Sequence, residues 1–174
     1  VVGPPQLAQP ARPGRPAVST VLEDPPYGGP VAGLAAGLAA IPKPEGAPLI
    51  AVLACDVPRA GRAIPSLLEV LEQAPDSDGA RLVDADGYGQ NLLAVYRSAS
   101  LRGAVASADR RGDARGMSMR ALVAHLRLLD VADDDGLGFD ADTWEAVEAL
   151  DSILREETRD RTRAAAAHVH RIDG

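Results

Sequence analysis

The sequence predicts a single α/β domain with a doubly wound, mostly parallel sheet, and two observations support this prediction. Residues Leu49–Cys55 are seven apolar residues in succession, which is typical of a parallel strand that is buried on both faces. Residues Ile64–Gln73 follow with helical spacing that places Leu67, Leu68 and Leu71 on one side. Strand, loop and helix thus succeed one another, and we expect Leu49–Cys55 to be the central strand of an open sheet.

The remaining elements extend this pattern on both sides of the central strand. Pro30 suits the first position of a helix, and Gly33 and Gly37 would let that helix pack closely on the sheet. The turn composition of residues 86–89, Asp-Gly-Tyr-Gly, predicts a pair of antiparallel strands around it. The expected strands are Val18–Leu22, Ala80–Asp84, Asn91–Tyr96 and Leu128–Ala132, and the expected helices are Val31–Ala40, Leu101–Asp109, Ser118–Leu126 and 143–154.

Composition and charge exclude several classes of protein. The length of 174 residues suits one domain, because it buries a single core of ordinary size. A net charge of −7 and an aromatic content of 3% disfavour a nucleic-acid partner, which needs basic patches and stacking side chains. Cys55 is the only cysteine, which excludes an intramolecular disulfide, fits a reducing cytoplasm and, in a buried strand, indicates an inert packed thiol. No apolar stretch is long enough to cross a bilayer, so we expect no membrane association.

Asp56 is the strongest candidate for a functional residue. Its carboxylate directly follows the apolar run, at the edge where an open α/β sheet binds its ligand, and carboxylate oxygens suit a hard cation such as Mg²⁺. The residues alone equally allow Asp56 to cap the next segment or to accept loop amides. Asp24 precedes Pro-Pro-Tyr-Gly-Gly-Pro, and alone it indicates only a turn. Gly28, Gly29 and Gly33 would let backbone amides approach a phosphate, but their spacing matches no phosphate-binding motif.

Four segments in one order resemble the bacterial molybdenum cofactor guanylyltransferases, of the MobA-like NTP transferase family. They are Glu23-Asp24, Gly29–Gly33, Leu53–Pro58 and Phe139–Glu145. The family pattern at these places is an acid before GPLAG, a strand that ends in CDMP, and a late F-x-N-x-N/D-T-P-E segment. The resemblance covers residues 1–150 and implies a nucleotidyltransferase with a Rossmann-like fold.

The resemblance also implies an activity and the residues that serve it. The activity is the transfer of GMP from GTP to the molybdopterin cofactor, with release of pyrophosphate. In such enzymes the aspartate of the CDMP segment, here Asp56, binds Mg²⁺ beside the nucleotide phosphates. The acid before GPLAG, here Asp24, helps to bind the guanine nucleotide, together with Gly29 and Gly33. The implied partners are GTP, molybdopterin and other proteins of molybdenum cofactor biosynthesis.

The chain departs from the family pattern at several positions. Val57, Asp140 and Trp144 replace the family's methionine, first asparagine and proline, and Asp140 would repel an anionic pterin phosphate. Asp142 is better explained as a helix N-cap. Within residues 1–174 nothing matches the family's opening strand and L-A-G-G-x-S-x-R-M-G-x-D-K loop, which holds the triphosphate. Because a central strand needs neighbours on both sides, we expect the reading frame to continue upstream of Val1 into such a segment.

The residues also allow two functions other than GMP transfer. Relatives of this fold transfer CMP to the same pterin or activate sugar phosphates, and such an enzyme is the first alternative. The second is a noncatalytic interaction domain that lacks the nucleotide loop. Residues 1–154 are expected to form the transferase domain without its N-terminal unit. Residues 155–174, with their dense mixed charge, are expected to form a solvated tail.

Overall fold

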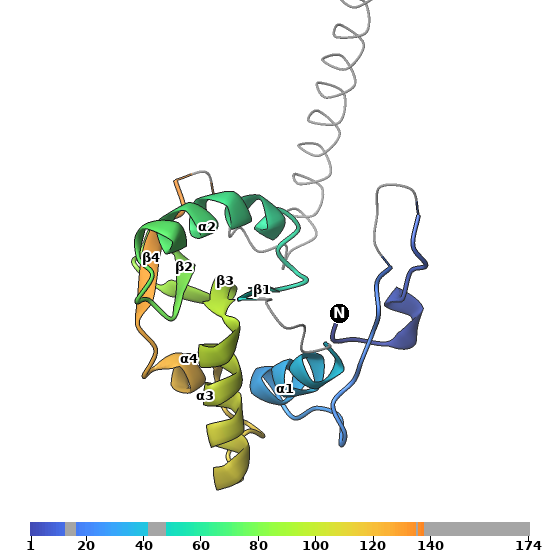
Figure 1. The fold of residues 1–174 in the computed structure, drawn as a ribbon. Coiled ribbons are helices and arrows are strands. Elements are labelled where there is room, and N and C mark those ends of the chain that lie inside the picture. The colour runs from blue at the N-terminus through green and yellow to red at the C-terminus, as the bar shows by residue number, and fades with distance from the viewer. Residues whose placement is uncertain (13–16, 42–47, 135, 138–174) are drawn as a thin grey trace, which may run out of the picture.

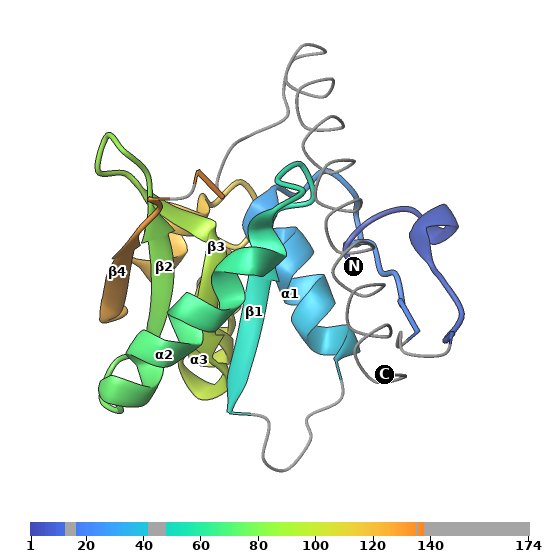
Figure 2. The same cartoon turned by 90° about the horizontal axis from the view of Figure 1, so that it is seen from above.

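A computed structural model describes residues 1–12, 17–41, 48–134 and 136–137, which form a four-stranded sheet with helices on both faces (Figures 1 and 2). The strands are β1 (Leu49–Leu53), β2 (Gly79–Val83), β3 (Gly89–Arg97) and β4 (Leu128–Ala132), in the spatial order β1-β3-β2-β4. β3 is antiparallel to β1 and β2, and β4 is parallel to β2. Three strands therefore run in one direction and β3 in the other, which confirms the predicted α/β class.

Helices cover the two faces of the sheet in unequal numbers. The helices are α1 (Pro30–Ala40), α2 (Ile64–Gln73), α3 (Ser98–Arg111) and α4 (Met119–Val123), with short 3₁₀ turns η1 (Pro5–Leu7) and η2 (Ala60–Ala63). α2 packs on the face to which Leu93 and Val95 of β3 point, while α1, α3 and α4 pack on the face of Ala94 and Tyr96. This alternation follows the period of two of a strand.

Tyr96 shows how the core accommodates a polar atom. Its ring is fully buried in the face of α1, α3 and α4, and its hydroxyl donates a hydrogen bond of 2.7 Å to the carbonyl oxygen of Asn91. Burial raises the pKa of the Tyr96 phenol well above its ordinary value. The side chain is therefore a neutral core residue whose one donor is satisfied.

Most of the expected elements are present. The bounds of α2 and β4 agree with the prediction, and α1 begins with Pro30 at its first turn. Ser118 caps α4, because its hydroxyl oxygen accepts a hydrogen bond of 3.2 Å from the amide of Ala121. α3 extends to Arg111 because Gly112, with φ of 73°, ends it in the left-handed conformation.

Some expectations fall elsewhere or outside the described residues. The expected strand Val18–Leu22 forms only isolated bridges with residues 1–12, the N-terminal arm, at Val2–Val21 and Gln9–Val18. The expected helix at 143–154, Asp140, Asp142 and the tail 155–174 lie outside the described residues. Within the described residues no helix is both long and apolar enough to pass through a membrane.

The prediction that Leu49–Cys55 is a central strand buried on both faces is wrong for the sheet described here. β1 is the terminal strand of that sheet and pairs only with β3. Ala51 and Leu53 are exposed, the latter by 38%. Cys55 lies beyond the end of β1 and is exposed, so the expectation of a packed thiol is wrong as well. A run of apolar residues does not show whether a strand has a neighbour at each edge, and for this reason the predicted burial of β1 was wrong.

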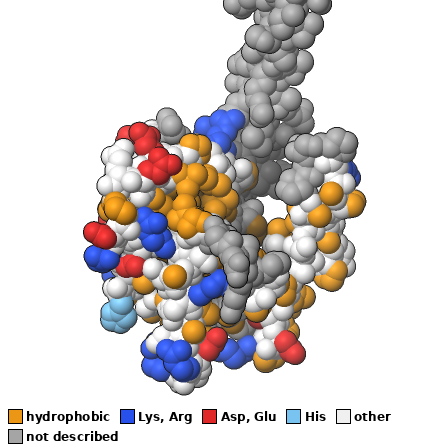
Figure 3. Space-filling view, in the orientation of Figure 1, with side chains coloured by type: hydrophobic (Ala, Val, Ile, Leu, Met, Phe, Trp, Pro, Cys, Tyr) orange, Lys and Arg blue, Asp and Glu red, His pale blue; other side chains and the backbone are white. Residues whose placement is uncertain are grey.

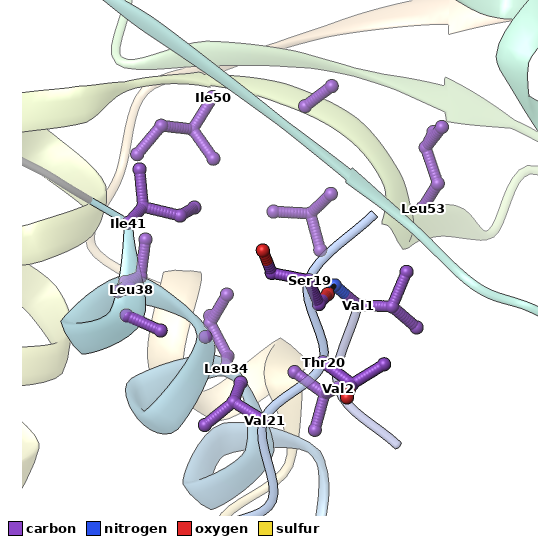
Figure 4. A pocket seen from close by; sticks show the side chains of 14 residues that line it. Val1, Val2, Ser19, Thr20, Val21, Leu34, Leu38, Ile41, Ile50 and Leu53 are labelled. Atoms are coloured by element: carbon purple, nitrogen blue, oxygen red, sulfur yellow. Dashed lines mark hydrogen bonds between the residues drawn. The ribbon is translucent and has the colours of Figure 1, made fainter. Parts of the chain in front are cut away.

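An apolar groove lies along β1 and explains this exposure. It has a volume of about 240 Å³ and separates β1 from the N-terminal arm, with α1 along one side. Figure 4 shows the side chains that face it, and Figure 3 shows the arm beside the rest of the molecule. Among the described residues its lining has no charged side chain and consists of Val1, Val2, Ser19, Thr20, Val21, Leu34, Gly37, Leu38, Ala40, Ile41, Ile50, Ala51, Val52 and Leu53.

The arm reaches α1 through two glycines. A Cβ atom on Gly33 would lie 3.2 Å from Cγ1 of Val2, and one on Gly37 would lie 3.1 Å from Cγ2 of the same residue. Any larger side chain at either position would push the arm away from the helix. The two glycines therefore do not serve the expected close packing of α1 on the sheet, because the residue that approaches them is Val2 of the arm.

Candidate functional site

Several aspartates follow the strands at one edge of the sheet. β1, β2 and β4 run in the same direction, so their carboxyl ends lie at a common edge, where open α/β sheets bind ligands. Asp84 follows β2 directly, Asp133 follows β4 directly, and Asp56 lies in the turn after β1. The sequence singled out only the last of them.

Asp84 and Asp133 are used by the turns that follow their strands. The Asp84 carboxylate accepts hydrogen bonds from the amides of Asp86 and Tyr88, at 3.1 and 2.8 Å. It also accepts one of 2.7 Å from the side-chain amide of Gln90. The Asp133 carboxylate accepts one of 2.7 Å from the amide of Leu137. Both carboxylates therefore act as turn caps, a common role for aspartate.

Asp56 differs from these two aspartates. Its side chain is exposed and takes no hydrogen bond or ion pair from any residue in the described ranges. The next 3₁₀ turn, η2, begins after Arg59 without a side-chain cap, so Asp56 does not cap it. The structure thus removes the capping explanation that the sequence left open. It leaves an uncommitted carboxylate beside the carboxyl end of β1.

Asp24 lies in the loop that leads into α1. The loop and the first turn of α1 lie at the end of the sheet at which β1 ends (Figure 2). The Asp24 side chain is exposed and has no partner among the described residues, so it does not close a turn. Glu23 takes that role, because its carboxylate accepts a hydrogen bond of 3.3 Å from the amide of Gly28. The turn that the sequence assigned to Asp24 is thus formed by its neighbour.

The connection between α3 and α4 holds this loop in place. The Arg115 guanidinium donates to the carbonyl oxygens of Pro25 and Pro26, at 2.7 and 3.3 Å, and the amide of Gly116 donates to the carbonyl oxygen of Gly28 at 2.8 Å. Gly28 is buried, and a Cβ atom on it would lie 2.5 Å from Cβ of Ala32. The loop conformation is therefore defined by contacts from both sides.

A hollow of about 360 Å³ lies beside Asp24. Its lining combines the carboxylates of Glu23, Asp24 and Asp109 with Arg115 and small apolar residues of and near α1, namely Ala32, Ala35, Ala36, Ala39 and Ala114. Asp56 is not part of that lining. The structure therefore brings the Asp24 loop and Asp56 to one end of the sheet without joining them in this hollow.

The two predicted glycine sites differ in structure. Gly29 has φ of 87°, a conformation that favours glycine, and is exposed just before α1. Gly33 is buried against Val2 and has a packing role. Within the described ranges no group of three or more His, Cys, Asp or Glu side chains is placed to hold a metal ion. A single carboxylate such as Asp56 still suits Mg²⁺, which is bound by one or two carboxylates together with substrate phosphates.

Comparison with known proteins places the chain in a family. Residues 1–130 match the family described as the MobA-like NTP transferase domain. The chain belongs to this family. Its structure resembles that of molybdopterin-guanine dinucleotide biosynthesis protein A from Archaeoglobus fulgidus, with a TM-score of 0.54 and 15% sequence identity over 80% of this chain and 69% of that one. At this identity the likeness shows a shared fold. No curated protein matches the sequence.

Sequence reasoning missed two residues of this MobA-like domain that shape the site. Glu23 was grouped with Asp24 as part of a motif, although it closes the loop. Arg115 lies about ninety positions away from the prolines that it contacts, and no local pattern signals such a contact. The sequence did contain one signal of this contact, the pair Gly28-Gly29, because adjacent glycines indicate a backbone that another part of the protein approaches closely.

Proposed function

We propose that this MobA-like domain transfers GMP from GTP to the molybdopterin cofactor. The terminal phosphate oxygen of the cofactor would attack the α-phosphorus of GTP, a new P–O bond would form, and the bond to the bridging oxygen would break to release pyrophosphate. Membership of a nucleotidyltransferase family supports this class of reaction. Other proteins of molybdenum cofactor biosynthesis are the proposed partners, and the cytoplasm the proposed compartment.

The observation that carries the proposal is the state of Asp56. Among the aspartates that follow the strands at the carboxyl edge, Asp84 and Asp133 cap turns, whereas Asp56 has no partner among the described residues. A carboxylate that has no structural role and lies at the ligand-binding edge of the sheet is a good candidate to bind a ligand. In the proposal Asp56 holds Mg²⁺, which would neutralise charge as the α-phosphate is attacked.

Asp24 and Gly29 serve the nucleotide in this proposal. Both are exposed on the loop that Arg115 and Gly116 hold against the protein. A held loop lowers the entropy that binding would otherwise cost. Gly33 is also implied as a nucleotide-binding residue by the resemblance. Its contribution would be indirect, because it lets the arm approach α1. These residues position the nucleotide, and the reaction then depends on positioning and charge stabilisation.

A transfer assay tests the proposal. The chain is incubated with Mg²⁺, molybdopterin and either GTP or CTP, and pyrophosphate and the dinucleotide product are measured. We expect product with GTP only, and we expect Asp24→Ala to raise the KM for GTP with a smaller effect on kcat. The exposed turn residue Asp86 provides the matched control Asp86→Asn.

Three outcomes separate the alternatives. Product with CTP in place of GTP would favour a cytidylyltransferase, and an unaltered KM in Asp24→Ala would return Asp24 to a minor role in the loop. Absence of product with either nucleotide, from the chain and from the product of any longer open reading frame, would favour a noncatalytic interaction domain.

A further inference from the structure

Tyr27 is the most exposed of the large apolar and aromatic side chains within the described ranges, at 96%. Single exposed hydrophobic residues are common and need no explanation by themselves. The backbone of Tyr27 is less common, because its φ of 61° lies in the left-handed region, which a residue with a bulky side chain rarely adopts. Within the described residues no other non-glycine residue has a positive φ.

The loop around Tyr27 is held on both of its flanks. Arg115 donates to the carbonyl oxygens of the two residues before it, Pro25 and Pro26, at 2.7 and 3.3 Å. The residue after it, Gly28, is bonded through its carbonyl oxygen to Gly116 and through its amide to Glu23. Backbone strain persists only where the surrounding contacts determine the conformation, and such positions gather at ligand-binding sites. The ring is thus displayed in solvent from a fixed backbone.

We propose that Tyr27 is a stacking contact for the planar base of the bound nucleotide, and that Arg115 keeps the ring in position. The inference rests on the proposed function, because it assigns a base contact to the loop that carries Asp24 and Gly29. An aromatic ring stacks on any base, since every base presents a π-face. Tyr27 therefore contributes affinity for the nucleotide and leaves the choice between guanine and cytosine to other residues.

A base-stacking role for Tyr27 gives a reason for the hydrogen bonds that hold its loop. A ring on a free loop would have to be ordered when the base binds, and that ordering weakens affinity. Arg115 orders the loop in advance through two backbone carbonyls, so it positions Tyr27 together with Asp24 and Gly29. Arg115 is a positioning residue in this account.

Equilibrium binding measured by calorimetry tests the proposal with two probes, GTP and inorganic tripolyphosphate, each with Mg²⁺. Tyr27→Ala is expected to raise the Kd for GTP roughly tenfold, the loss typical of one base stack, and to leave the Kd for tripolyphosphate unchanged. Tyr27→Phe keeps the ring and is expected to stay within about twofold of the original affinity. Tyr88, exposed by 68% in the turn between β2 and β3, provides the matched control Tyr88→Ala, which should bind like the unaltered chain.

Arg115 is tested in the same assay. Arg115→Ala is expected to weaken GTP binding at least as much as Tyr27→Ala, and the double variant to be no weaker than Arg115→Ala alone, because Tyr27 depends on the loop that Arg115 holds. Arg111→Ala removes a guanidinium that bonds Asp113 and Ser107 instead, and it should have no effect. Thermal unfolding followed by circular dichroism confirms that each variant is folded.

The outcomes distinguish this inference from the proposed function. If the chain binds GTP and Tyr27→Ala binds it equally well, the stacking contact is refuted and the proposed function stands. If Tyr27→Ala weakens GTP and tripolyphosphate alike, the residue supports the fold of the site and does not contact the base. If neither the unaltered chain nor the product of any longer open reading frame binds either probe, both the stacking contact and the proposed function are wrong.

Discussion

Two neighbouring strands, β1 and β3, use similar residues in different ways. Both are rich in leucine, valine and alanine, and they pair with each other in antiparallel register. β3 has a strand at each edge and a helix on each face, and residues 93–96 are at most 3% exposed. β1 has β3 at one edge and the apolar groove at the other. Apolar composition directs a strand into a sheet, but its burial depends on the neighbours that the sheet provides.

The largest expected difference concerns a directly paired couple of leucines. Leu53 of β1 and Leu93 of β3 are partners in the register, yet Leu93 is 3% exposed and Leu53 is 38% exposed. Leu93→Ala should lower the free energy of unfolding by about 2–5 kcal/mol, because it leaves a cavity in a packed core. Leu53→Ala should lower it by less than about 1 kcal/mol, because its site already opens to solvent. Urea unfolding of the two variants measures both values, and equal losses would show that β1 is covered as completely as β3.

A smaller, pH-dependent effect is expected on the well-packed side of the sheet. Asp78 precedes β2 and accepts hydrogen bonds from the amide of Arg127 at 2.8 Å and from the hydroxyl of Ser100 at 2.7 Å. These bonds, led by that from Arg127, hold the pKa of Asp78 below its ordinary value, against the opposing effect of burial. Asp78→Asn should therefore cost about 1–2 kcal/mol of stability at neutral pH.

The sign of this pH dependence follows from the lowered pKa. Because the folded state binds the proton less tightly than the unfolded state, the stabilisation is complete above the unfolded pKa of about 3.9. It disappears as pH falls through the lower pKa of the folded state. The difference in stability between the original chain and Asp78→Asn should thus be constant from pH 6 to 7 and should shrink in acid, as the pH falls below the unfolded pKa and through the lower folded pKa. A gap that stays constant into acid would contradict the role of the charge.

The finest prediction concerns single amides of β1. Ala54 donates to Leu92, and Ser98 donates to Pro48, so the even-numbered residues of β1 bond β3 while Leu49, Ala51 and Leu53 turn their backbone groups to the groove. Hydrogen exchange followed by nuclear magnetic resonance should show these three amides exchanging about tenfold or more faster than those of Ile50 and Val52. β3, paired at both edges, should show no such alternation between residues 93 and 96. Uniform protection along β1 would mean that its outer edge is covered.

Much of the fold was predictable from local patterns. α2 has strong helical spacing of leucines, and its bounds were predicted correctly. The turn around Gly87 and the cap at Ser118 carry residue types that favour those conformations, and the structure contains both. The position of Asp56 after a strand was also predictable, because a carboxylate that ends an apolar run is visible in the sequence itself.

The remainder depends on contacts between distant segments. The residues near Leu53 in the sequence do not indicate that the outer edge of β1 borders a groove and not another strand. The hydrogen bonds from Arg115 to the loop of Asp24 join segments about ninety residues apart, and Tyr27, with its left-handed backbone, lies in that loop. Exposure, loop conformation and the geometry of the site are therefore properties of the assembled molecule.

The most direct test of the proposed chemistry is the Mg²⁺-dependent transfer activity of Asp56→Asn. Asparagine keeps the size of the side chain and removes the charge that would bind the metal, and the exposed position of Asp56 makes a loss of fold unexpected. We expect transfer to fall by roughly a hundredfold or more, with an unchanged circular dichroism spectrum and with Asp86→Asn as active as the original chain. Full metal-dependent activity in a folded Asp56→Asn variant would remove Asp56 from the mechanism.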